Sequence, residues 1–508
     1  MKNLKRRTKH TKKVIQKKEL KFIIQQNQAI FGNAFLGKRA TDAEITQAEQ
    51  KLALKIPDPF IWFLKEYGCG GYWFDIMGYC KNGKPEFVEI TLEQRKNGLP
   101  EKYIIIEDCD EFYYCIDSVS GKISSWSQYD KDGVYSGSSL LESGVLHVFY
   151  TGNVRYTGDY DYVTSGREQN VLSVSSLDGI HFNHKQLLMT NKDFPHTMTK
   201  HVRDPQIFKE DNQYYMVLGA RHLENKGLVL IYESQDMTHW TYLNELTTSN
   251  TFGYMWECPD IIILGKHRFL IACPQGVERV EYKYQNSHQC GYFEVHGDFR
   301  KNGTLGEFQQ FDYGFDFYSA RTFINQNGER ILFAWLGMSE ASYTKNQTAQ
   351  DGWEQALALP RLLKYKDHHI YQIPIPQLKS LRHHHEQFNL QQKFHKNSLC
   401  FEMIIHFLTS TDFHMHLRED CYISYNCQES LLTLTMYQCG DGREKRSVII
   451  QDLYKLQIFS DISSLEIFIN DGYYTMSTRI FGNCDDIIIN KVNAQADFYE
   501  LLPYQIEW

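Results

Sequence analysis

Two short motifs place a carboxylate close to a proline at the entry to an apolar strand, and their side chains are suited to acid–base chemistry. Arg203-Asp204-Pro205 leads into Gln206-Ile207-Phe208, and Glu257 stands two residues before Pro259 in a segment that continues as Ile261–Leu264. An acid with a raised pKa beside a second carboxylate is the pair that cleavage of a glycosidic bond requires. We therefore predict that Asp204 and Glu257 share one pocket.

Neighbouring residues would tune these two carboxylates. We expect Trp256, Tyr254 and Phe252 to form an apolar wall that raises the pKa of Glu257 by desolvation and offers a face to a sugar ring. Arg203 would keep Asp204 ionised. A single acid before a strand is usually a turn or cap residue, so the prediction depends on the two acids occurring in repeated units.

The repeat begins beyond Asp130. Each unit has a short apolar strand, a polar turn and a second, aromatic-rich strand that ends in small residues, as in 138–152, 206–219, 260–273 and 321–337. The segment 178–182 is echoed by 236–240. Units of several short antiparallel strands are typical of β-propeller blades, and we count four blades in a domain at 132–368. On this count, Pro205 and Pro259 occupy the same position in successive blades, so Asp204 and Glu257 would open the innermost strands and point to the same end of the axis.

The regions on either side of the repeat have different patterns. At 30–131 we predict a small α+β domain, because Thr41 and Glu44 form a capping box and Asp58-Pro59 starts a second helix that Gly68 ends. Its strands are predicted at 72–79, 87–91 and 103–106, with a hairpin at 112–126. At 375–508, alternating strands at 400–407, 431–436, 465–469 and 474–480, with a turn at 470–472, predict a β-sandwich. The fold class is therefore mostly β.

The composition narrows the possible partners. The net charge of −8 with mixed signs argues against a nucleic-acid partner, because phosphate backbones require a clustered positive field. The basic segment at 1–29 is either a solvated start or a local contact with nucleic acid or membrane. No apolar run is long enough to span a bilayer, so no membrane partner is expected.

The cysteines and histidines suggest neither a disulfide framework nor a metal site. Twelve scattered cysteines without a Cys-x-x-Cys motif favour reduced thiols and a cytoplasmic location. His383-His384-His385 has no second ligand cluster and is interpreted as a surface turn, so no metal is predicted.

The N-terminal domain resembles a known family of binding modules. Ala40–Ile45, Ala48–Leu52, Ile56-Pro57 and Phe63–Gly68 are similar to the opening of a SUKH-type domain, a superfamily that includes bacterial immunity proteins. The resemblance covers about 30–130. It implies a protein-binding module rather than an enzyme, and hence a possible protein partner.

The rest of the chain, about 133–508, resembles glycoside hydrolase family 32, the group of invertases, sucrose-6-phosphate hydrolases and fructanases. The motifs that carry this resemblance are Arg203–Pro205, Trp256–Asp260, Tyr135–Ser138, Phe149–Asn153, Asp316–Ala320, Trp353, Pro360-Arg361 and Leu465–Gly472. The resemblance implies a retaining β-fructosidase without a cofactor, with Glu257 as general acid/base, Asp204 as transition-state stabiliser and a fructosyl sugar, sucrose or sucrose 6-phosphate, as substrate. The implied substrate-binding residues are Arg203, Cys258, Trp256, Ser136, Tyr318 and Trp353.

The sequence departs from the family at its first blade. The family's five-bladed propeller begins with a Trp-x-Asn-Asp-Pro-Asn type motif that supplies the nucleophilic aspartate, and no such motif occurs here. Pro57-Asp58-Pro59 is a near match, but it is better explained as a helix start. We therefore predict an incomplete propeller with unpaired edges and impaired hydrolysis, because a retaining double displacement needs a nucleophile. The alternative is a SUKH-type binding module fused to an inactive fructosidase remnant.

Overall fold

The computed structural model describes residues 17–27, 34–35, 37–71, 75–79, 81–109, 112–183, 185–339, 348, 352–390, 393–396, 398–418, 420–437, 444–482, 486–490 and 492–504. The chain divides into two compact units, one formed by 1–133 with 182–186 and the other by 134–181 with 187–508. Each unit is described by itself. Most of the basic segment predicted at 1–29 lies outside the described residues.

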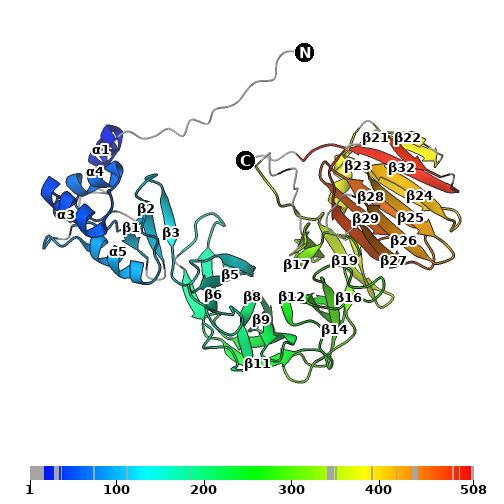
Figure 1. Ribbon diagram of the computed structural model, residues 1–508, viewed down its shortest axis with the longest axis horizontal. Helices are drawn as coiled ribbons and strands as arrows, with labels where there is room; N and C mark the ends of the chain where they lie inside the picture. The colour runs from blue at the N-terminus through cyan, green and yellow to red at the C-terminus, as the bar shows by residue number, and fades with distance from the viewer. Residues whose placement is uncertain are drawn as a thin grey trace, which may run out of the picture. The chain divides into compact units, whose positions relative to one another are not determined.

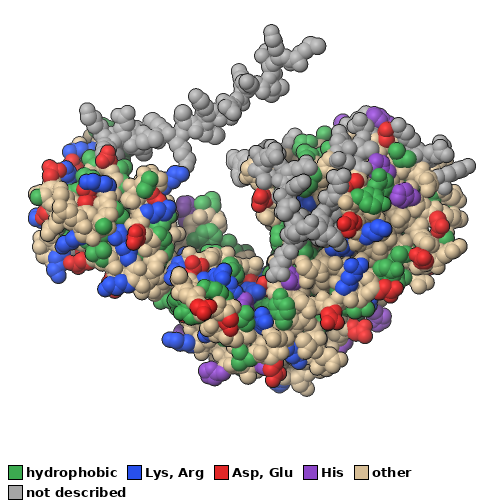
Figure 2. All heavy atoms as spheres, viewed as in Figure 1, with side chains coloured by type: hydrophobic (Ala, Val, Ile, Leu, Met, Phe, Trp, Pro, Cys, Tyr) green, Lys and Arg blue, Asp and Glu red, His purple; other side chains and the backbone are tan. Residues whose placement is uncertain are grey.

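The first unit packs helices against a three-stranded sheet (Figure 1). Its elements are α1 (Lys17–Gln26), α3 (Asp42–Leu52), α4 (Asp58–Glu66), α5 (Glu86–Lys96), β1 (Tyr103–Asp108), β2 (Tyr113–Asp117) and β3 (Ile123–Trp126). The capping box is confirmed: the Glu44 amide donates to Thr41 Oγ1 at 3.3 Å, and the Thr41 amide donates to Glu44 Oε2 at 2.9 Å. Lys/Arg and Asp/Glu side chains are interspersed on the face of this unit that Figure 2 shows.

The strand predicted at 87–91 is wrong, because these residues belong to helix α5. Its buried residues, Phe87, Val88, Thr91 and Gln94, have helical spacing. Acids in its first turn and bases in its last turn complement the helix dipole. The β-branched Val88, Ile90 and Thr91 favour a strand locally, and packing of the helical face against β1 overrides that preference. The strand predicted at 72–79 lies partly outside the described residues, and 75–79 forms only isolated bridges.

Four antiparallel sheets follow one another in the second unit, as blades do in a propeller. Their strands are β4 (Val134–Glu142), β5 (Val145–Arg155), β6 (Arg167–Ser176) and β7 (Gln186–Met189); β8 (Met198–Glu210), β9 (Gln213–His222), β10 (Gly227–Ser234) and β11 (Thr241–Leu246); β12 (Met255–Leu264), β13 (His267–Gln275), β14 (Gly291–His296), β15 (Thr304–Leu305) and β16 (Gln309–Gln310); and β17 (Tyr318–Ile324), β18 (Arg330–Trp335), β19 (Arg361–Lys366) and β20 (His369–Pro374). No sheet of the described part closes on itself, and the propeller is incomplete.

The innermost strands β4, β8, β12 and β17 share one irregularity. Each strand carries one extra residue relative to its neighbour. In β8, β12 and β17 two residues therefore face a single residue of the neighbouring strand, within 203–206, 257–260 and 318–321, and in β4 the extra residue is Ser136, between the paired Tyr135 and Gly137. The residue just after the first paired position has a positive φ in three blades: Asp204 (63°), Cys258 (50°) and Ser319 (55°). A β-bulge of this kind re-aims side chains at a strand end, and here it recurs where the candidate site lies.

Successive blades are also joined by a repeated hydrogen bond. A main-chain amide of one blade donates to a side chain of the preceding blade: Ile207 to Ser138 Oγ (3.0 Å), Ile261 to Gln206 Oε1 (3.3 Å) and Thr322 to Asp260 Oδ2 (2.9 Å). The fourth blade has Arg321 at the acceptor position, and its guanidinium points back to the carbonyls of Pro259 and Asp204. This series of contacts fixes the inner strands relative to one another.

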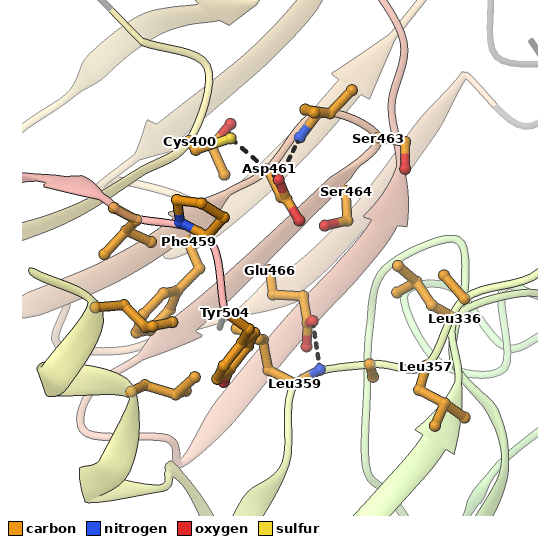
Figure 3. A pocket seen from close by; sticks show the side chains of 18 of the residues that line it. Leu336, Leu357, Leu359, Cys400, Phe459, Asp461, Ser463, Ser464, Glu466 and Tyr504 are labelled. Carbon is orange, nitrogen blue, oxygen red and sulfur yellow. Dashed lines mark hydrogen bonds between the residues drawn. The ribbon is translucent and has the colours of Figure 1, made fainter. Parts of the chain in front are cut away.

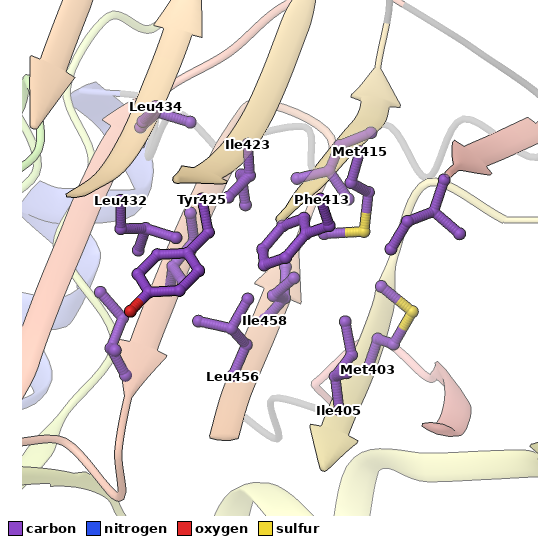
Figure 4. Packing of buried hydrophobic residues seen from close by; sticks show 14 of the residues in the cluster. Met403, Ile405, Phe413, Met415, Ile423, Tyr425, Leu432, Leu434, Leu456 and Ile458 are labelled. Atoms are coloured by element: carbon purple, nitrogen blue, oxygen red, sulfur yellow. The ribbon is translucent and has the colours of Figure 1, made fainter. Parts of the chain in front are cut away.

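A β-sandwich forms the C-terminal part, reached through a short 3-10 helix, η2 (Pro376–Leu381). One six-stranded sheet contains β21 (Arg382–Asn389), β32 (Ala494–Leu501), β23 (Phe401–Phe407), β28 (Lys455–Ser460), β29 (Ser464–Ile469) and β30 (Tyr474–Arg479). The other contains β22 (Lys393–His395), β31 (Asp486–Ile489), β24 (Phe413–Arg418), β25 (Cys421–Asn426), β26 (Leu431–Met436) and β27 (Lys445–Ile449). Figure 4 shows their core, where Leu456 and Ile458 face Phe413 and Ile423 across the two layers.

The predicted sandwich strands and the turn at 470–472 are confirmed, with positive φ at Asn470, Asp471 and Gly472. The triple histidine is not a turn, because His383–His385 are exposed residues of strand β21. In the part of the chain that the structure describes, His, Cys, Asp and Glu form no group suited to a metal, and no helix is long and apolar enough to cross a membrane.

Candidate active site

The bulges of β8, β12 and β17 bring the predicted acids together, although not in the predicted alignment. The strand pairings show that Glu257 is equivalent to Arg203 and Tyr318, whereas Asp204 is equivalent to Cys258. When Pro205 is aligned with Pro259, Asp204 corresponds to Cys258, the residue after Glu257. Because neighbouring residues of a strand point to opposite sides, this offset of one residue decides which side chains meet.

Glu257 lies at the centre of a charged cluster. Its Oε1 accepts hydrogen bonds from Nη2 (2.6 Å) and Nε (3.1 Å) of Arg203, and its Oε2 accepts one from the Tyr318 hydroxyl (2.6 Å). The ring of His288 lies 6.0 Å from that of Tyr318. Both carboxylate oxygens are thus held by residues from the two adjoining blades.

This arrangement lowers the pKa of Glu257. Burial by itself would raise that pKa, but the Arg203 guanidinium and the hydrogen bond from Tyr318 outweigh it. The prediction that an apolar wall raises the pKa of Glu257 is therefore wrong. The prediction assigned Arg203 to Asp204, whereas the structure directs its guanidinium to Glu257.

Asp204 has the opposite electrostatic behaviour. Burial raises its pKa, and the nearby Glu257 charge adds to this effect, while Arg203 and Arg321 oppose it. Its Oδ2 accepts a hydrogen bond from the Cys258 amide (2.9 Å), and its own amide donates to Thr151 Oγ1 (2.8 Å). Asp204 thus belongs to the same buried cluster as Glu257 but is more reluctant to ionise.

Cys258 joins Asp204 to the next blade. Its Sγ lies 3.7 Å from Asp204 Oδ2 and 2.8 Å from Ser319 Oγ. A hydrogen bond with Cys273 and burial raise its pKa well above the ordinary value for a thiol. Cys258 is therefore a neutral thiol at physiological pH, suited to positioning rather than to nucleophilic attack.

Trp256 does not reach the site. It is fully buried, its ring stacks on Phe293 at 4.9 Å, and its Nε1 donates to the Phe252 carbonyl at 2.7 Å. Strand alternation explains this position, because Trp256 points into the core between blades while Glu257 points the other way. Trp256 and Phe252 thus support the strand from behind and offer no face to a sugar.

Ser136 and Trp353 were also predicted to bind substrate. Ser136 is an exposed residue in the bulge of β4. Trp353 lies beneath the Arg479 guanidinium, 5.5 Å away, and lines a cavity of about 870 Å³ beside the sandwich. Figure 3 shows this cavity between Leu336 and Leu357 of the propeller and Phe459 and Asp461 of the sandwich.

Several residues near the carboxylates had no signal in the sequence. Arg203 Nη1 contacts His201 Nδ1 (2.7 Å) and Gln169 Oε1 (3.2 Å). The pKa of His201 is lowered to about 3 by burial and by nearby arginines, so its ring is neutral. His201 lies two residues before Arg203 in the sequence, and only this proximity could have indicated its role. Gln169 comes from another blade, so its position in the sequence gave no such indication.

Together these residues form a site for proton transfer at an oxygen atom. Glu257 can exchange a proton, Asp204 provides a second carboxyl group, and Arg203 and Tyr318 donate hydrogen bonds. The third buried carboxylate nearby, Asp260, is bound to Thr322 of the next blade and serves the blade contact. An incomplete propeller joined to a sandwich, with two neighbouring buried carboxyl groups, has the groups that cleavage of a glycosidic bond uses.

Comparison with known families gives the class a definite identity. A model for the glycosyl hydrolases family 32 N-terminal domain matches residues 119–374, and one for the family 32 C terminal matches 376–501. The chain belongs to glycosyl hydrolase family 32. A third model, described as SMI1-KNR4 cell-wall and of the SUKH type, matches residues 20–139. The resemblances to both families are thereby confirmed.

Individual relatives agree with this assignment. Sucrose-6-phosphate hydrolase of Bacillus subtilis is 34% identical over 373 residues, which cover 70% of this chain and 75% of the relative. Among solved structures, sucrose-6-phosphate hydrolase from Lactobacillus gasseri superimposes with a TM-score of 0.67 at 25% identity, covering 79% of this chain and 88% of the other. A Bombyx mori β-fructofuranosidase mutant in complex with sucrose has the same fold, with a TM-score of 0.63 at 22% identity, covering 83% and 98%.

Proposed function

We propose that the chain is a glycoside hydrolase of the β-fructofuranosidase type that acts on sucrose or sucrose 6-phosphate. The observation that carries the proposal is the buried Glu257 carboxylate, held by Arg203 and Tyr318 beside a second carboxyl group, that of Asp204. The relatives named for sucrose 6-phosphate hydrolysis, and the relative solved with sucrose, support this substrate class.

The proposed roles follow from the contacts. Glu257 is the general acid/base that protonates the leaving oxygen, and Asp204 stabilises the oxocarbenium-like transition state. Arg203, Tyr318 and Cys258 bind and orient the fructosyl unit around them. Ser136 remains a proposed substrate contact at the bulge of β4, and Trp353 one at the cavity beside the sandwich.

We further propose that turnover is impaired. The sequence has no Trp-x-Asn-Asp-Pro-Asn motif, and a retaining mechanism needs a carboxylate to form the glycosyl–enzyme bond. The near match, Pro57-Asp58-Pro59, lies at the start of helix α4, where Pro59 is in the first turn. A bound fructosyl sugar would therefore contact the acid/base Glu257 and the stabiliser Asp204, but no residue at the position of the family's nucleophile.

Fructose release from sucrose and from sucrose 6-phosphate by the purified full-length chain tests this function. Glu257→Gln should lower the rate by about 10²–10⁴-fold, the usual contribution of a general acid or base. Glu294→Gln is the matched control, because Glu294 of β14 pairs with His267 of β13 at the strand ends away from Glu257, and the substitution should leave the rate unchanged. No fructose above the blank would show that the chain lacks this activity. Equal rates of fructose release for the two variants would show that Glu257 is not the general acid/base.

A second candidate function belongs to the first unit, because the SUKH-type match covers it and it has its own hydrophobic core. We propose that this unit binds a protein partner, as the family resemblance implies. If the hydrolytic test fails, the chain is then a binding module fused to an inactive hydrolase. A partner captured by the full-length chain should be lost when Trp62→Ala and Phe63→Ala disturb the aromatic cluster of α4, while the fold of the second unit persists. The cytoplasm is the compartment proposed with either function, on the sequence argument from the cysteines.

A further inference from the structure

The buried guanidinium of Arg203 joins three blades. On one edge, its Nε and Nη2 donate to Oε1 of Glu257 on β12, at 3.1 and 2.6 Å. At the other end, its Nη1 donates to Oε1 of Gln169 on β6 at 3.2 Å and lies 2.7 Å from Nδ1 of His201 on β8. Four of the five N–H groups of the guanidinium are thus directed to protein acceptors, which gives the group one orientation toward Glu257.

The ring of His201 is fixed as an acceptor for Arg203. Its Nε2 lies 3.0 Å from the carbonyl oxygen of Tyr162, which can only accept, so Nε2 carries the proton. Its Nδ1 is then unprotonated, as the donor-only guanidinium of Arg203 requires. Burial and the charges of Arg203 and Arg167 lower the pKa of His201 to about 3, so the ring stays neutral at physiological pH and Nδ1 remains an acceptor.

Gln169 is held in place on the first of these blades. It has no exposed surface, and its main-chain amide donates to Oδ1 of Asn191 at 2.9 Å. Its side-chain oxygen accepts from Arg203, because the opposite orientation of the amide group would set two donors against each other. Gln169 and His201 are therefore both neutral acceptors, and they bind Nη1 without competing with Glu257 for the positive charge.

His201 has a second contact, which offers a purely structural explanation of its place. The His201 Nε2–H donates to the Tyr162 carbonyl, and the Lys200 amide donates to the Val163 carbonyl at 2.8 Å. Both hydrogen bonds tie the loop between β5 and β6 to strand β8. This tie uses Nε2 and the main chain only, so it does not explain why Nδ1 meets Arg203 at 2.7 Å.

We propose that His201 and Gln169 are positioning residues that act through Arg203. By binding Nη1, they keep the opposite edge of the guanidinium, Nε and Nη2, on Glu257. The inference rests on the proposed function, in which Glu257 is the general acid/base. A guanidinium free to rotate would lose hydrogen bonds to the carboxylate, and fixed placement of charged groups contributes strongly to enzymatic rates.

Infrared titration of the Glu257 carboxyl band in the full-length chain tests this inference without turnover, with Glu257→Gln to assign the band. His201→Leu removes the acceptor and should raise the pKa of Glu257, because a loosened Arg203 stabilises the carboxylate less. His222→Leu is the control from the same blade and should leave this pKa unchanged, because the ring of His222 accepts from the Glu224 amide in its own turn.

Two further substitutions separate the two contacts of the His201 ring. The side-chain oxygen in His201→Asn can replace Nδ1, whereas the longer amide in His201→Gln reaches toward the Tyr162 carbonyl in place of Nε2. The pKa of Glu257 should therefore be closer to the wild-type value in His201→Asn than in His201→Gln. In the hydrolysis assay, the alkaline limb of kcat/KM should move to higher pH in the same order, and kcat on the acidic plateau should fall by about 10- to 100-fold in His201→Leu.

The outcomes separate this inference from the proposed function. Equal Glu257 pKa values in His201→Leu and His222→Leu, or a His201→Asn variant no closer to wild type than His201→Gln, would overturn the positioning role even if sucrose is hydrolysed. A raised pKa without fructose release would support the role and contradict the hydrolytic proposal. Thermal unfolding checks that each variant is folded. If His201→Leu does not fold, Gln169→Leu takes its place and should raise the same pKa by less, because its hydrogen bond to Arg203 is longer.

Discussion

At the scale of single residues, Glu257 is held as a carboxylate, whereas a general acid has to be protonated before it acts. Arg203 and Tyr318 stabilise its carboxylate, whereas protonation of a leaving oxygen requires the carboxyl form. The protonated fraction falls as the pH rises through the lowered pKa of Glu257. Acid catalysis should therefore be favoured on the acidic side of neutrality.

Tyr318→Phe tests how much of this effect the phenol supplies. Loss of its 2.6 Å hydrogen bond removes a contact that stabilises the carboxylate, so the pKa of Glu257 should rise and the alkaline limb of kcat/KM should move to higher pH. An infrared titration of the carboxyl band measures the same pKa without turnover, with Glu257→Gln to assign the band. An unchanged or lower pKa in Tyr318→Phe would contradict this account.

The sequence predicted which acids would meet but not how they would be held. Asp204 and Glu257 were identified by their repeated setting, and both lie in one buried cluster. The assignment of Arg203 to Asp204 failed because it relied on proximity along the chain. Contacts across blades depend on the side to which each residue points, and one inserted residue reverses that side.

At the scale of elements, the bulges and helix α5 show where sequence patterns stop being informative. The inner strands were predicted correctly from their apolar runs, because burial of those runs fixes strand formation. The bulges at Asp204, Cys258 and Ser319 were not predicted, because no residue type in the sequence indicates a positive φ at a non-glycine position. Helix α5 was not predicted because 87–91 is only five residues long and three of them are β-branched, and so short a run is compatible with a strand as well as with a helix.

Phe87→Ala tests the helical packing of α5. The Phe87 ring is fully buried, with ring centroids 5.3 Å from Phe60 and 5.8 Å from Tyr79, so truncation leaves a cavity in the core of the first unit. We expect a loss of about 3–5 kcal/mol in the unfolding free energy of that unit, measured by hydrogen exchange at the amides of β1. Leu92→Ala is the control on the exposed side of the same helix and should cost less than about 1 kcal/mol. Similar losses in the two variants would contradict the orientation of α5.

At the scale of the whole second unit, the propeller and the sandwich share a buried polar junction. Arg361 of β19 has no exposed surface, and its Nη2 donates to Glu466 of β29 (2.8 Å) and to Ser477 of β30 (2.6 Å). Asp312 accepts from the Ser477 amide at 2.8 Å, and Gly314 lies so close to Ser477 that a Cβ would be only 2.2 Å from its carbonyl oxygen. The last blade and the sandwich should therefore unfold together.

Arg361→Ala should be strongly destabilising because it leaves Glu466 and Asp312 as buried, unpaired acids. Breaking a buried ion pair typically costs about 3–5 kcal/mol. Lys209→Ala, which removes a partly exposed pair with Glu142, should cost less than about 1 kcal/mol. Urea unfolding followed by tryptophan fluorescence compares the two variants, and an equal loss in both would show that the junction contributes little.

The hydrogen bonds between blades also give the propeller two unlike ends. One amide in each of β8, β12 and β17 donates to a side-chain acceptor of the blade before it, so the contacts between blades have a direction. At one end, β4 has the equivalent amide, that of Ser139, with no earlier blade in the described chain to supply an acceptor; at the other, Arg321 replaces the acceptor with a donor. Any sheet that extends the array must match the polarity of the end it joins, so the two ends are not interchangeable.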